Sequence, residues 1–259
     1  MLDLSHRNGK YFYSIFFNPV SRVMKSELFI KYFKLIDKRS SVLDYGSGDG
    51  PYKEMLKTYF DKYVSADYYA TNVHHSVRPD IAIDDNQKVN VEDEIFSCVV
   101  LSEVLEHLYK PHLALQEINR VLSPNGYVIG SVPFFMWEHE KPYDFHRYTY
   151  FGLKRMFEEN GFEIVKLDYV GDIIGVSTYC FSKIFGIFLK PIRKIKPLHF
   201  VLKTIVSIPS LLYYAIVKIK FMKSFFMKYF GEYPFGLYLF LKKSINAVPR
   251  NFTFLFRNI

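Results

Sequence analysis

The sequence predicts an α/β protein of three layers, in which helices cover both faces of a mostly parallel sheet. Two observations lead to this prediction. Short apolar segments typical of strands alternate with segments of helical periodicity between residues 41 and 170, which is the pattern of a parallel sheet. One segment, residues 94–103, has a continuous apolar core, as expected for a strand that is buried on both faces.

The first predicted strand and the helix after it, residues 51–60, enclose a turn with three glycines, Asp44-Tyr-Gly-Ser-Gly-Asp-Gly50. Glycine allows positive φ and close approach of a ligand to the backbone. The helix start behind the turn offers unpaired N–H groups and a positive dipole end. The turn therefore predicts a site for a nucleotide-like ligand, whose binding residues include Asp44, Tyr45, Gly46, Gly48 and Gly50.

The spacing D-x-G-x-G-x-G differs from the G-x-G-x-x-G of dinucleotide folds. It resembles the first motif of the class I S-adenosylmethionine-dependent methyltransferases. A second stretch, Ser102-Glu-Val-Leu-Glu-His107 followed by Glu117-Ile-Asn-Arg-Val-Leu-Ser-Pro-Asn-Gly126, looks like the small-molecule members of that family. The resemblance implies a Rossmann-like fold, S-adenosylmethionine as cofactor, Asp44 near its methionine end, and Ser102 and Glu103 among the residues that bind it.

Carboxylates also follow the second and third predicted strands. Residues 62–67 end in Asp67, 23 residues after Asp44 and close to the interval of about 20 at which an acid binds ribose hydroxyls. The two oxygens of a carboxylate match a vicinal diol, so Asp67, followed by Tyr68, is the predicted ribose ligand, with an ordinary loop aspartate as the alternative. By the resemblance, the acid after residues 79–83 lies beside the adenine. Asp84 is the first choice and Asp85 the second, and either could instead cap the following turn.

The remaining elements complete the sheet. The helix that follows residues 94–103 buries Leu113, Leu115, Ile118, Val121 and Leu122 and stops at Pro124-Asn-Gly126. Strands are predicted at 127–133 and 162–170, with a helix at 150–160 between them. The resemblance requires a seventh strand antiparallel to the rest, for which residues 237–243 are the candidate.

These elements divide the chain into four parts. Residues 1–40 form an N-terminal helical cap, with a helix from Ser21 to Ile36 that lids or flanks the sheet. The Rossmann-like domain comprises residues 41–170 and 232–243. Residues 171–231 are a basic, apolar helical insertion between strands six and seven, and residues 244–259 are a tail.

Titratable and aromatic side chains gather in residues 134–149, after the carboxyl end of the fifth strand, where open α/β sheets bind ligands. Within this loop, P-x-D-F-x-R-Y-T at 142–149 resembles a subgroup of these methyltransferases found with bacterial surface-polysaccharide enzymes. For a hydroxyl acceptor, His139 is the first candidate base, with Glu138 and His146 behind it. The predicted acceptor-binding residues are Trp137, Asp144, Arg147 and Tyr148.

Histidine and cysteine give no metal-ligand spacing in the sequence, so no metal is predicted. The histidines in question, His74, His75, His107 and His112, are scattered among loops and helix starts. His107 is more typical of a histidine that ties a loop beside the cofactor than of a proton-transfer group. Cys98 and Cys180 lie in apolar surroundings and form no disulfide framework.

Charge is unevenly divided along the chain. The net charge is +8, but residues 173–259 carry 14 basic residues and one acid, or +13, and the first 172 residues carry −5. The longest uncharged run of the insertion, Thr204–Val217, has 14 residues with Pro209 among them, which is short of the roughly 20 needed to cross a bilayer. The insertion therefore predicts helices that lie on an anionic membrane surface; a helical cap or a dimer surface is the alternative.

The expected protein is cytoplasmic and peripheral on the inner face of the cytoplasmic membrane, because residues 1–10 lack a signal peptide. No nucleic-acid-recognition module is visible. The favoured reaction is O-methylation of a small-molecule or lipid-linked glycan. A quinone or lipid precursor as acceptor, a non-catalytic scaffold and a nicotinamide-dependent oxidoreductase are the alternatives, and the oligomeric state is not predicted.

Overall fold

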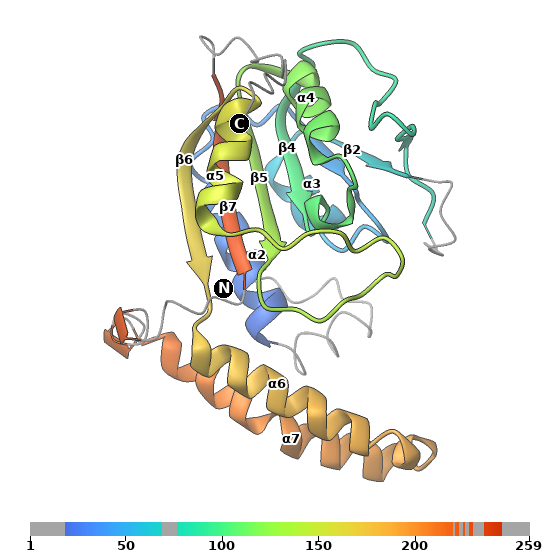
Figure 1. The fold of residues 1–259 in the computed structure, drawn as a ribbon, viewed down its shortest axis with the longest axis vertical. Coiled ribbons are helices and arrows are strands. Elements are labelled where there is room, and N and C mark those ends of the chain that lie inside the picture. Colours follow the sequence, from blue (N-terminus) through green and yellow to red (C-terminus); the bar gives the residue numbers. More distant parts are fainter. Residues whose placement is uncertain are drawn as a thin grey trace, which may run out of the picture.

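The structure is a computed structural model that describes residues 19–68, 77–219 and 236–244, with a few positions between 221 and 229. Its centre is a seven-stranded sheet with helices on both faces (Figure 1). Residues 1–18 of the predicted cap and residues 245–259 of the tail lie outside the described residues, as do His74 and His75. In chain order the elements are α2 (Pro19–Phe33), β1 (Ser41–Tyr45), α3 (Lys53–Tyr59), β2 (Lys62–Asp67), β3 (Ile81–Ala82), β4 (Phe96–Ser102), η1 (Leu105–His107), α4 (Pro111–Val121), β5 (Leu122–Pro133), α5 (Tyr150–Glu159), β6 (Phe162–Val170), α6 (Ile173–Phe188), η2 (Pro191–Lys194), α7 (Lys196–Val217) and β7 (Gly236–Lys243).

The strand order is β3-β2-β1-β4-β5-β7-β6. The pairs from β3 to β5 are parallel, whereas β7 is antiparallel to both of its neighbours, β5 and β6. This arrangement confirms the predicted fold class, including the antiparallel seventh strand. β1 and β4 are parallel neighbours, and the strand order reverses between them. Open α/β sheets bind ligands at such a point, beyond the carboxyl ends of the strands.

Two apolar layers fix the helices on the sheet. On one face, Phe29 and Phe33 of α2 and Leu56 of α3 pack with strand residues such as Val100 and Ile129. On the other face, α4 and α5 bury their apolar sides against alternate strand residues. Successive strand side chains point to opposite faces, so one continuous apolar strand can supply both layers. The helix of the predicted cap therefore flanks the sheet.

The connection between α4 and β5 differs from the prediction. The helix ends at Val121, and Leu122 already pairs with Phe96 of β4, so Pro124-Asn-Gly126 lies inside β5. The register shifts between Phe96 and Cys98, and the irregular segment of β5 takes up this shift. Leu113 is half-buried, whereas the other helix positions predicted to be apolar and buried are buried.

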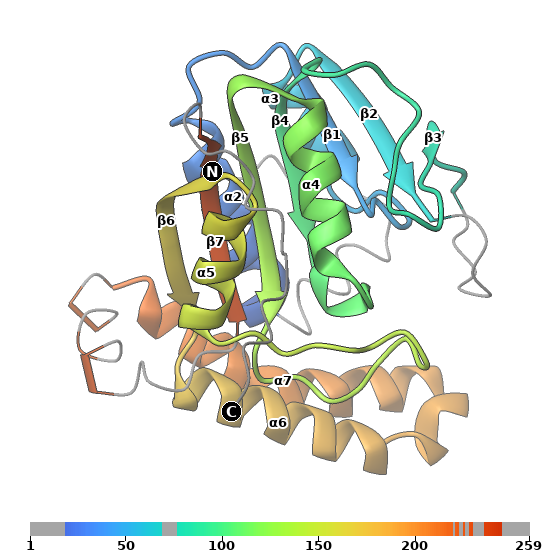
Figure 2. The same cartoon turned by 45° about the horizontal axis from the view of Figure 1, so that its top comes forward.

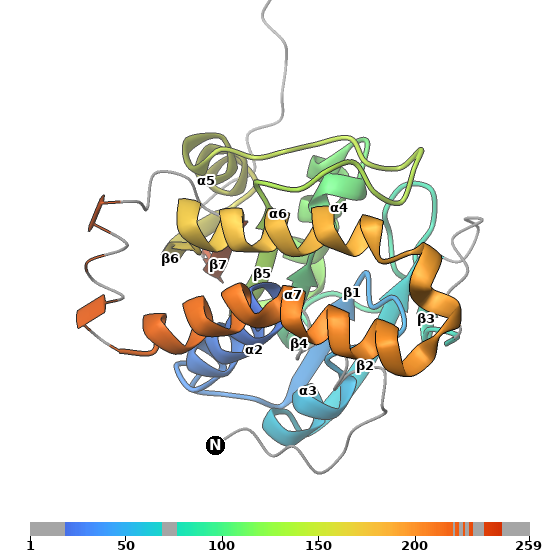
Figure 3. The same ribbon diagram turned by 90° about the horizontal axis from the view of Figure 1, so that it is seen from below.

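The insertion forms a hairpin of two long helices beneath the carboxyl edge of the sheet (Figures 2 and 3). Asp172 begins α6, because its carboxylate accepts hydrogen bonds from the Ile174 and Gly175 N–H groups at 3.0 Å. The Ser182 hydroxyl donates to the Val206 carbonyl at 3.1 Å, and Gly175 packs so closely on Tyr213 that a Cβ there would lie 2.8 Å from the ring. The two helices are therefore antiparallel and in contact.

The second helix of the hairpin, α7, is longer than the sequence suggested. It has 22 residues, with Pro209 inside it. An 18-residue window of this helix has a mean hydropathy of 1.8, and 22% of that window is buried. By length and composition this helix could cross a membrane. The helix is longer than the uncharged run Thr204–Val217 because it also includes residues 196–203. That the insertion lies on a membrane surface stays a prediction, since length and composition alone do not place a helix.

Candidate functional site

The glycine turn between β1 and α3 has the backbone that its sequence predicts. Gly46, Gly48 and Gly50 have φ values of +74°, +52° and +67°, a region that other L-residues adopt only under strain. A Cβ on Gly46 would lie 2.4 Å from a methyl carbon of Val104. The Gly46 N–H donates to the Ala66 carbonyl at 2.8 Å, so the turn is held against the end of β2.

Asp44 lies at the end of β1 and is buried. The Tyr63 hydroxyl donates a hydrogen bond to its Oδ2 at 3.0 Å. Burial raises the pKa of Asp44 to about 7; the hydrogen bond from Tyr63 opposes this shift and the negative charge of Asp67 adds to it. A cation beside Asp44 would restore the ionised form, which agrees with its predicted place near a charged cofactor.

Asp67 ends β2 and holds the turn from the other side. Its Oδ2 accepts a hydrogen bond from the Gly48 N–H, and its Oδ1 accepts one from the Tyr68 N–H at 2.7 Å. A carboxylate offers about four lone-pair sites, so these two bonds leave capacity for a diol. Asp67 therefore fixes the glycine turn and keeps acceptor capacity for the predicted ribose.

The two acids predicted near the adenine have different contacts. Asp84 caps its own turn, since its Oδ1 accepts from the Asn86 and Lys88 N–H groups at 2.8 Å. Asp85 instead accepts a hydrogen bond from the Tyr68 hydroxyl. Asp84 therefore makes the turn cap that was the alternative for this pair, and the adenine contact stays a prediction for both acids.

The acid at the end of β4 is linked to the N-terminal helix. Glu103 has φ +56°, its Oε1 accepts from the Ser131 hydroxyl at 2.9 Å, and its Oε2 lies 3.0 Å from Nζ of Lys25 in α2. The Ser102 hydroxyl lies 3.3 Å from that of Ser131. The ion pair of Lys25 was not predicted from the sequence. The one sequence feature that could have indicated it is the position of this lysine on the buried side of an apolar helix.

Glu106 is the most unusual group of this edge. Its side chain is fully buried in η1, and neither carboxylate oxygen has a hydrogen-bond partner among the described residues. Burial, followed by the negative charge of Glu103, raises its pKa, whereas Lys25 and Arg147 act in the opposite direction. Buried carboxylates without donors are rare, and each one requires an explanation.

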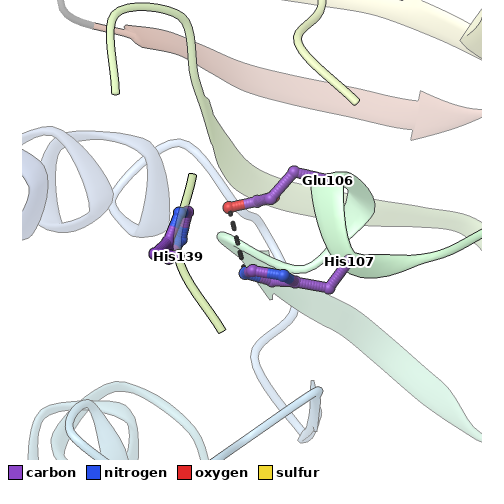
Figure 4. A group of neighbouring side chains, drawn as sticks. All are labelled: Glu106, His107 and His139. Atoms are coloured by element: carbon purple, nitrogen blue, oxygen red, sulfur yellow. Dashed lines mark ion pairs between the residues drawn. The ribbon is translucent and has the colours of Figure 1, made fainter. Parts of the chain in front are cut away.

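Two histidines lie against Glu106, one from η1 and one from the loop 134–149 (Figure 4). Nε2 of His107 is 3.7 Å from Oε1 of Glu106, and the rings of His107 and His139 are 4.8 Å apart. Nδ1 of His107 lies 2.7 Å from the Tyr143 carbonyl oxygen, which ties the loop to η1 as predicted for this histidine. The spacing of these residues in the sequence does not indicate the cluster, because His139 is distant from His107 along the chain and only the fold of the loop brings the two rings together.

Asp144 and Arg147, both predicted to contact the acceptor, bind each other. The Arg147 guanidinium donates to the two carboxylate oxygens of Asp144 at 2.6 and 2.8 Å, and this interaction holds the pKa of Asp144 well below its usual range. Arg147 also donates to the Trp137 carbonyl at 3.2 Å, and the Tyr148 hydroxyl donates to the Leu105 carbonyl at 2.9 Å. These contacts make Asp144, Arg147 and Tyr148 residues that position the loop.

The other predicted loop residues take different places. Glu138 is exposed and pairs with Lys141 at 2.7 Å. His146 has a buried Nε2 without a hydrogen-bond partner among the described residues. Trp137 is 49% exposed and stacks on Tyr179 of α6 with ring centroids 5.6 Å apart, so the insertion contributes to this edge of the protein.

Comparisons with known proteins agree with this geometry. A family model described as "Methyltransferase domain" matches residues 20–167. A SAM dependent methyltransferase from Archaeoglobus fulgidus is 15% identical, with a TM-score of 0.52 over 91% of this chain and 100% of that one. A putative sarcosine dimethylglycine methyltransferase from Galdieria sulphuraria is 13% identical, with a TM-score of 0.52 over 86% and 84% of the two chains. The [4+2]-cyclase SpnF is 17% identical, with a TM-score of 0.52 over 85% and 80%. Among curated protein sequences, none matches this chain.

Proposed function

The chain belongs to the family of methyltransferase domains, and we propose that it moves a methyl group from S-adenosylmethionine to a hydroxyl of a membrane-proximal glycan. That it is an S-adenosylmethionine-dependent methyltransferase follows from the family together with the fold. The observation that carries the cofactor site is the turn of three left-handed glycines, whose Gly48 N–H is bound by Asp67. We infer the identity of the acceptor and the contact with a membrane from the side chains around this site and along the helical hairpin.

The reaction needs little covalent help from the protein. The acceptor oxygen attacks the methyl carbon in line, the carbon–sulfur bond breaks, its electron pair stays on sulfur, and the hydroxyl proton leaves to a base. Holding the two reactants at attack distance can supply about 7–11 kcal/mol, and a positioned base a further ~10²–10⁴-fold. His139 remains the predicted base, because Asp144 Oδ2 lies 3.2 Å from its Nδ1 and leaves Nε2 as the proton acceptor.

The proposed acceptor is a sugar because aromatic rings surround this edge of the sheet. Flat apolar faces with polar groups between them suit the faces and hydroxyls of a pyranose. The Nζ of Lys183 lies over the ring of Trp137, 5.0 Å from the ring centroid. The aromatic side chains that remain exposed near η1 and along the loop are Tyr109, Phe134, Phe135, Trp137, Tyr143 and Phe145.

The proposed membrane contact rests on the exposed side of the helical hairpin. Large apolar side chains are exposed along both helices and the tip, and contiguous exposed apolar surface of this kind marks interaction sites. Basic residues at the tip could approach anionic headgroups. The exposed apolar residues are Phe181, Ile184, Phe185, Ile187, Phe188, Ile195, Leu198, Phe200, Val201, Ile205, Ile208, Leu212, Ile216 and Ile219.

Two variants test the cofactor and acceptor roles separately. Asp67→Ala should weaken cofactor binding at least tenfold in calorimetric titration, whereas His139→Ala should lower turnover and leave cofactor affinity nearly unchanged. Asp61→Ala removes an exposed acid next to the same strand and should change neither quantity. If Asp67→Ala binds the cofactor as tightly as Asp61→Ala does, the proposed ribose role is wrong.

Substrate class is tested with labelled S-adenosylmethionine and three acceptor pools: lipid-linked glycans, quinone precursors and soluble sugars. Label should enter the lipid-linked glycan pool. Because one structural neighbour is a [4+2]-cyclase, the assay must detect methylated product and S-adenosylhomocysteine together. Cofactor binding without either product in any pool would support the non-catalytic alternative, and label confined to the quinone pool would overturn the glycan proposal.

Membrane contact is tested by co-sedimentation with vesicles. The protein should bind vesicles that contain anionic lipid, and replacing Lys190, Arg193 and Lys194 at the hairpin tip by glutamine should weaken that binding. Replacing Lys34, Lys38 and Arg39, which lie at the opposite, amino edge of the sheet, changes charge equally and should have little effect. Equal loss in both triple variants, or no binding by the wild type, would contradict the proposal.

A further inference from the structure

We propose that Glu106, His107 and His139 bind one divalent transition-metal ion of the zinc type, and that this ion holds the oxygen of the acceptor. The three side chains each offer one ligand atom, and these atoms lie within 4.8 Å of one another (Figure 4). The metal site stands on these residues alone. Its role toward the acceptor rests on the function proposed above.

The first argument is the state of Glu106. Glu106 is fully buried, and no donor from the described part of the chain reaches either of its carboxylate oxygens. Such burial of a charged group is costly unless something positive faces it. The lysine and arginine whose charges act on Glu106 are already paired: Lys25 with Glu103 at 3.0 Å, and Arg147 with Asp144 at 2.6 Å. A metal ion between Glu106 and the histidines would supply the missing partner.

The second argument is the orientation of the two imidazoles. Nδ1 of His107 faces the Tyr143 carbonyl oxygen at 2.7 Å, and this oxygen can only accept, so Nδ1 carries the proton and Nε2 keeps a lone pair. Nδ1 of His139 faces Oδ2 of Asp144 at 3.2 Å, which leaves its Nε2 free in the same way. Metal-bound histidines almost always have such a carbonyl or carboxylate on the second nitrogen.

Asp144 is itself held in place, which makes the support around the site complete. Arg147 donates to both of its oxygens, and the His139 N–H donates to Oδ2 at 2.9 Å. Glu140 adds a half-exposed carboxylate whose Oε2 is 3.7 Å from Nε2 of His107. The loop therefore supplies one ligand and a framework that orients it, and this explains why the loop is rich in titratable residues.

The chemistry of the ligands selects the ion. Two imidazoles and one carboxylate, without thiolate, suit zinc and its neighbours in the first transition row. Ligand atoms about 2.1 Å from a tetrahedral ion are separated by about 3.4 Å, so side-chain movements of about 1.5 Å or less would close the site. Three protein ligands leave a coordination position open, as in catalytic zinc sites.

An acceptor hydroxyl would occupy the open position. Coordination lowers the pKa of the hydroxyl, so its proton passes to solvent before transfer. The oxygen then bonds to the methyl carbon while the carbon–sulfur bond breaks and sulfur keeps the electron pair. With its Nε2 on the ion, His139 is a ligand and does not itself take the proton. If the ion holds the acceptor oxygen, removal of metal lowers turnover. If His139 is instead the base, removal of metal leaves turnover unchanged.

The test uses the full chain after removal of metal with a chelator and titration with Co²⁺, whose visible absorption reports imidazole and carboxylate coordination, followed by displacement with Zn²⁺. One Co²⁺ per chain should bind, with a saturable absorption band that Zn²⁺ abolishes. Glu106→Gln and His139→Ala should lower the affinity at least 100-fold. Asp144→Asn keeps all three ligands but weakens the contacts of residue 144 with His139 and Arg147, and it should lower the affinity about 10–100-fold.

His112→Ala is the matched control, because it removes an exposed histidine of α4 that lies outside the cluster, and it should bind like the wild type. Glu106→Gln keeps the shape of the side chain and relieves a buried charge, so it should fold. Absence of a saturable band in the wild type, or wild-type affinity in Glu106→Gln and His139→Ala, would overturn the site. Cofactor titration of the same samples distinguishes this outcome from failure of the proposed function, since cofactor binding does not need the ion. Turnover that is unchanged in chelated wild type would overturn the role of the ion while leaving the site.

Discussion

Replacing Gly46 by alanine should destabilise the protein through two separable effects. The residue has φ +74°, and a side chain in this left-handed region costs roughly 1–2 kcal/mol. The new Cβ would also lie 2.4 and 2.9 Å from the two methyl carbons of Val104, and such overpacking costs typically about 1–3 kcal/mol. Together we expect a loss of about 2–5 kcal/mol, a large part of the 5–15 kcal/mol typical of a domain.

A double-mutant cycle in urea separates the two effects. Val104→Ala removes both clashing methyl groups, so the Gly46→Ala/Val104→Ala protein should be more stable than the sum of the single changes by about 1–3 kcal/mol, while the φ penalty remains. Gly186→Ala in α6 is the control, because its Cβ would meet nothing within 4 Å; alanine is the better helix former and should be neutral or stabilising. If the effects of the Gly46 and Val104 changes are strictly additive, residues 46 and 104 are not in contact, and Val104, which directly precedes η1, does not pack closely on the glycine turn.

Two further predictions concern buried charge. Because the pKa of Asp44 is raised to about 7, by burial first and by Asp67, against the hydrogen bond from Tyr63, the protonated form stabilises the unliganded fold. The quantity to measure is the free energy of unfolding of the wild type minus that of Asp44→Asn. This difference should be greatest near pH 4 and fall by up to a few kcal/mol as the pH rises through 7. A difference that stays constant in urea titrations from pH 4 to 8 would contradict the assignment. Lys25→Met should cost about 2–4 kcal/mol, because it leaves Glu103, whose side chain is mostly buried, without its cation. Lys34→Met, which changes an exposed lysine just after the same helix, should be close to neutral in the same denaturation assay, and an equal effect of the two changes would show that the ion pair contributes nothing.

Local patterns predicted most of the sheet because each strand carries its own signal. The apolar segments at Lys62–Asp67 and Phe162–Val170 are strands with the predicted bounds. The glycine turn has its predicted backbone because no other residue tolerates that conformation as easily. Pro124-Asn-Gly126 misled the prediction, since pairing of Leu122 with Phe96 places the chain in the sheet before the turn residues are reached.

The site was harder to predict because its contacts are made between distant segments. Asp144 and Arg147 have the residue types of a substrate site, but their guanidinium and carboxylate satisfy each other. His139 meets His107 and Glu106 only because the Phe145 and His146 N–H groups bind the Glu106 carbonyl and fold the loop back. Helix α7 continues through Pro209, where Ser210 and Tyr213 pack on α6.

The position of the last strand has a consequence for how the chain assembles. Among the described strands, β6 bonds only to β7, and β7 bonds to β5 on its other side. The sixth strand therefore has no place on the sheet until residues 236–243 have been synthesised and have entered between its two neighbours. Closing contacts over so long an intervening chain is slow. Until then the nascent protein displays the bare edge of β5, and the helical hairpin is synthesised while the sheet beside it is still incomplete.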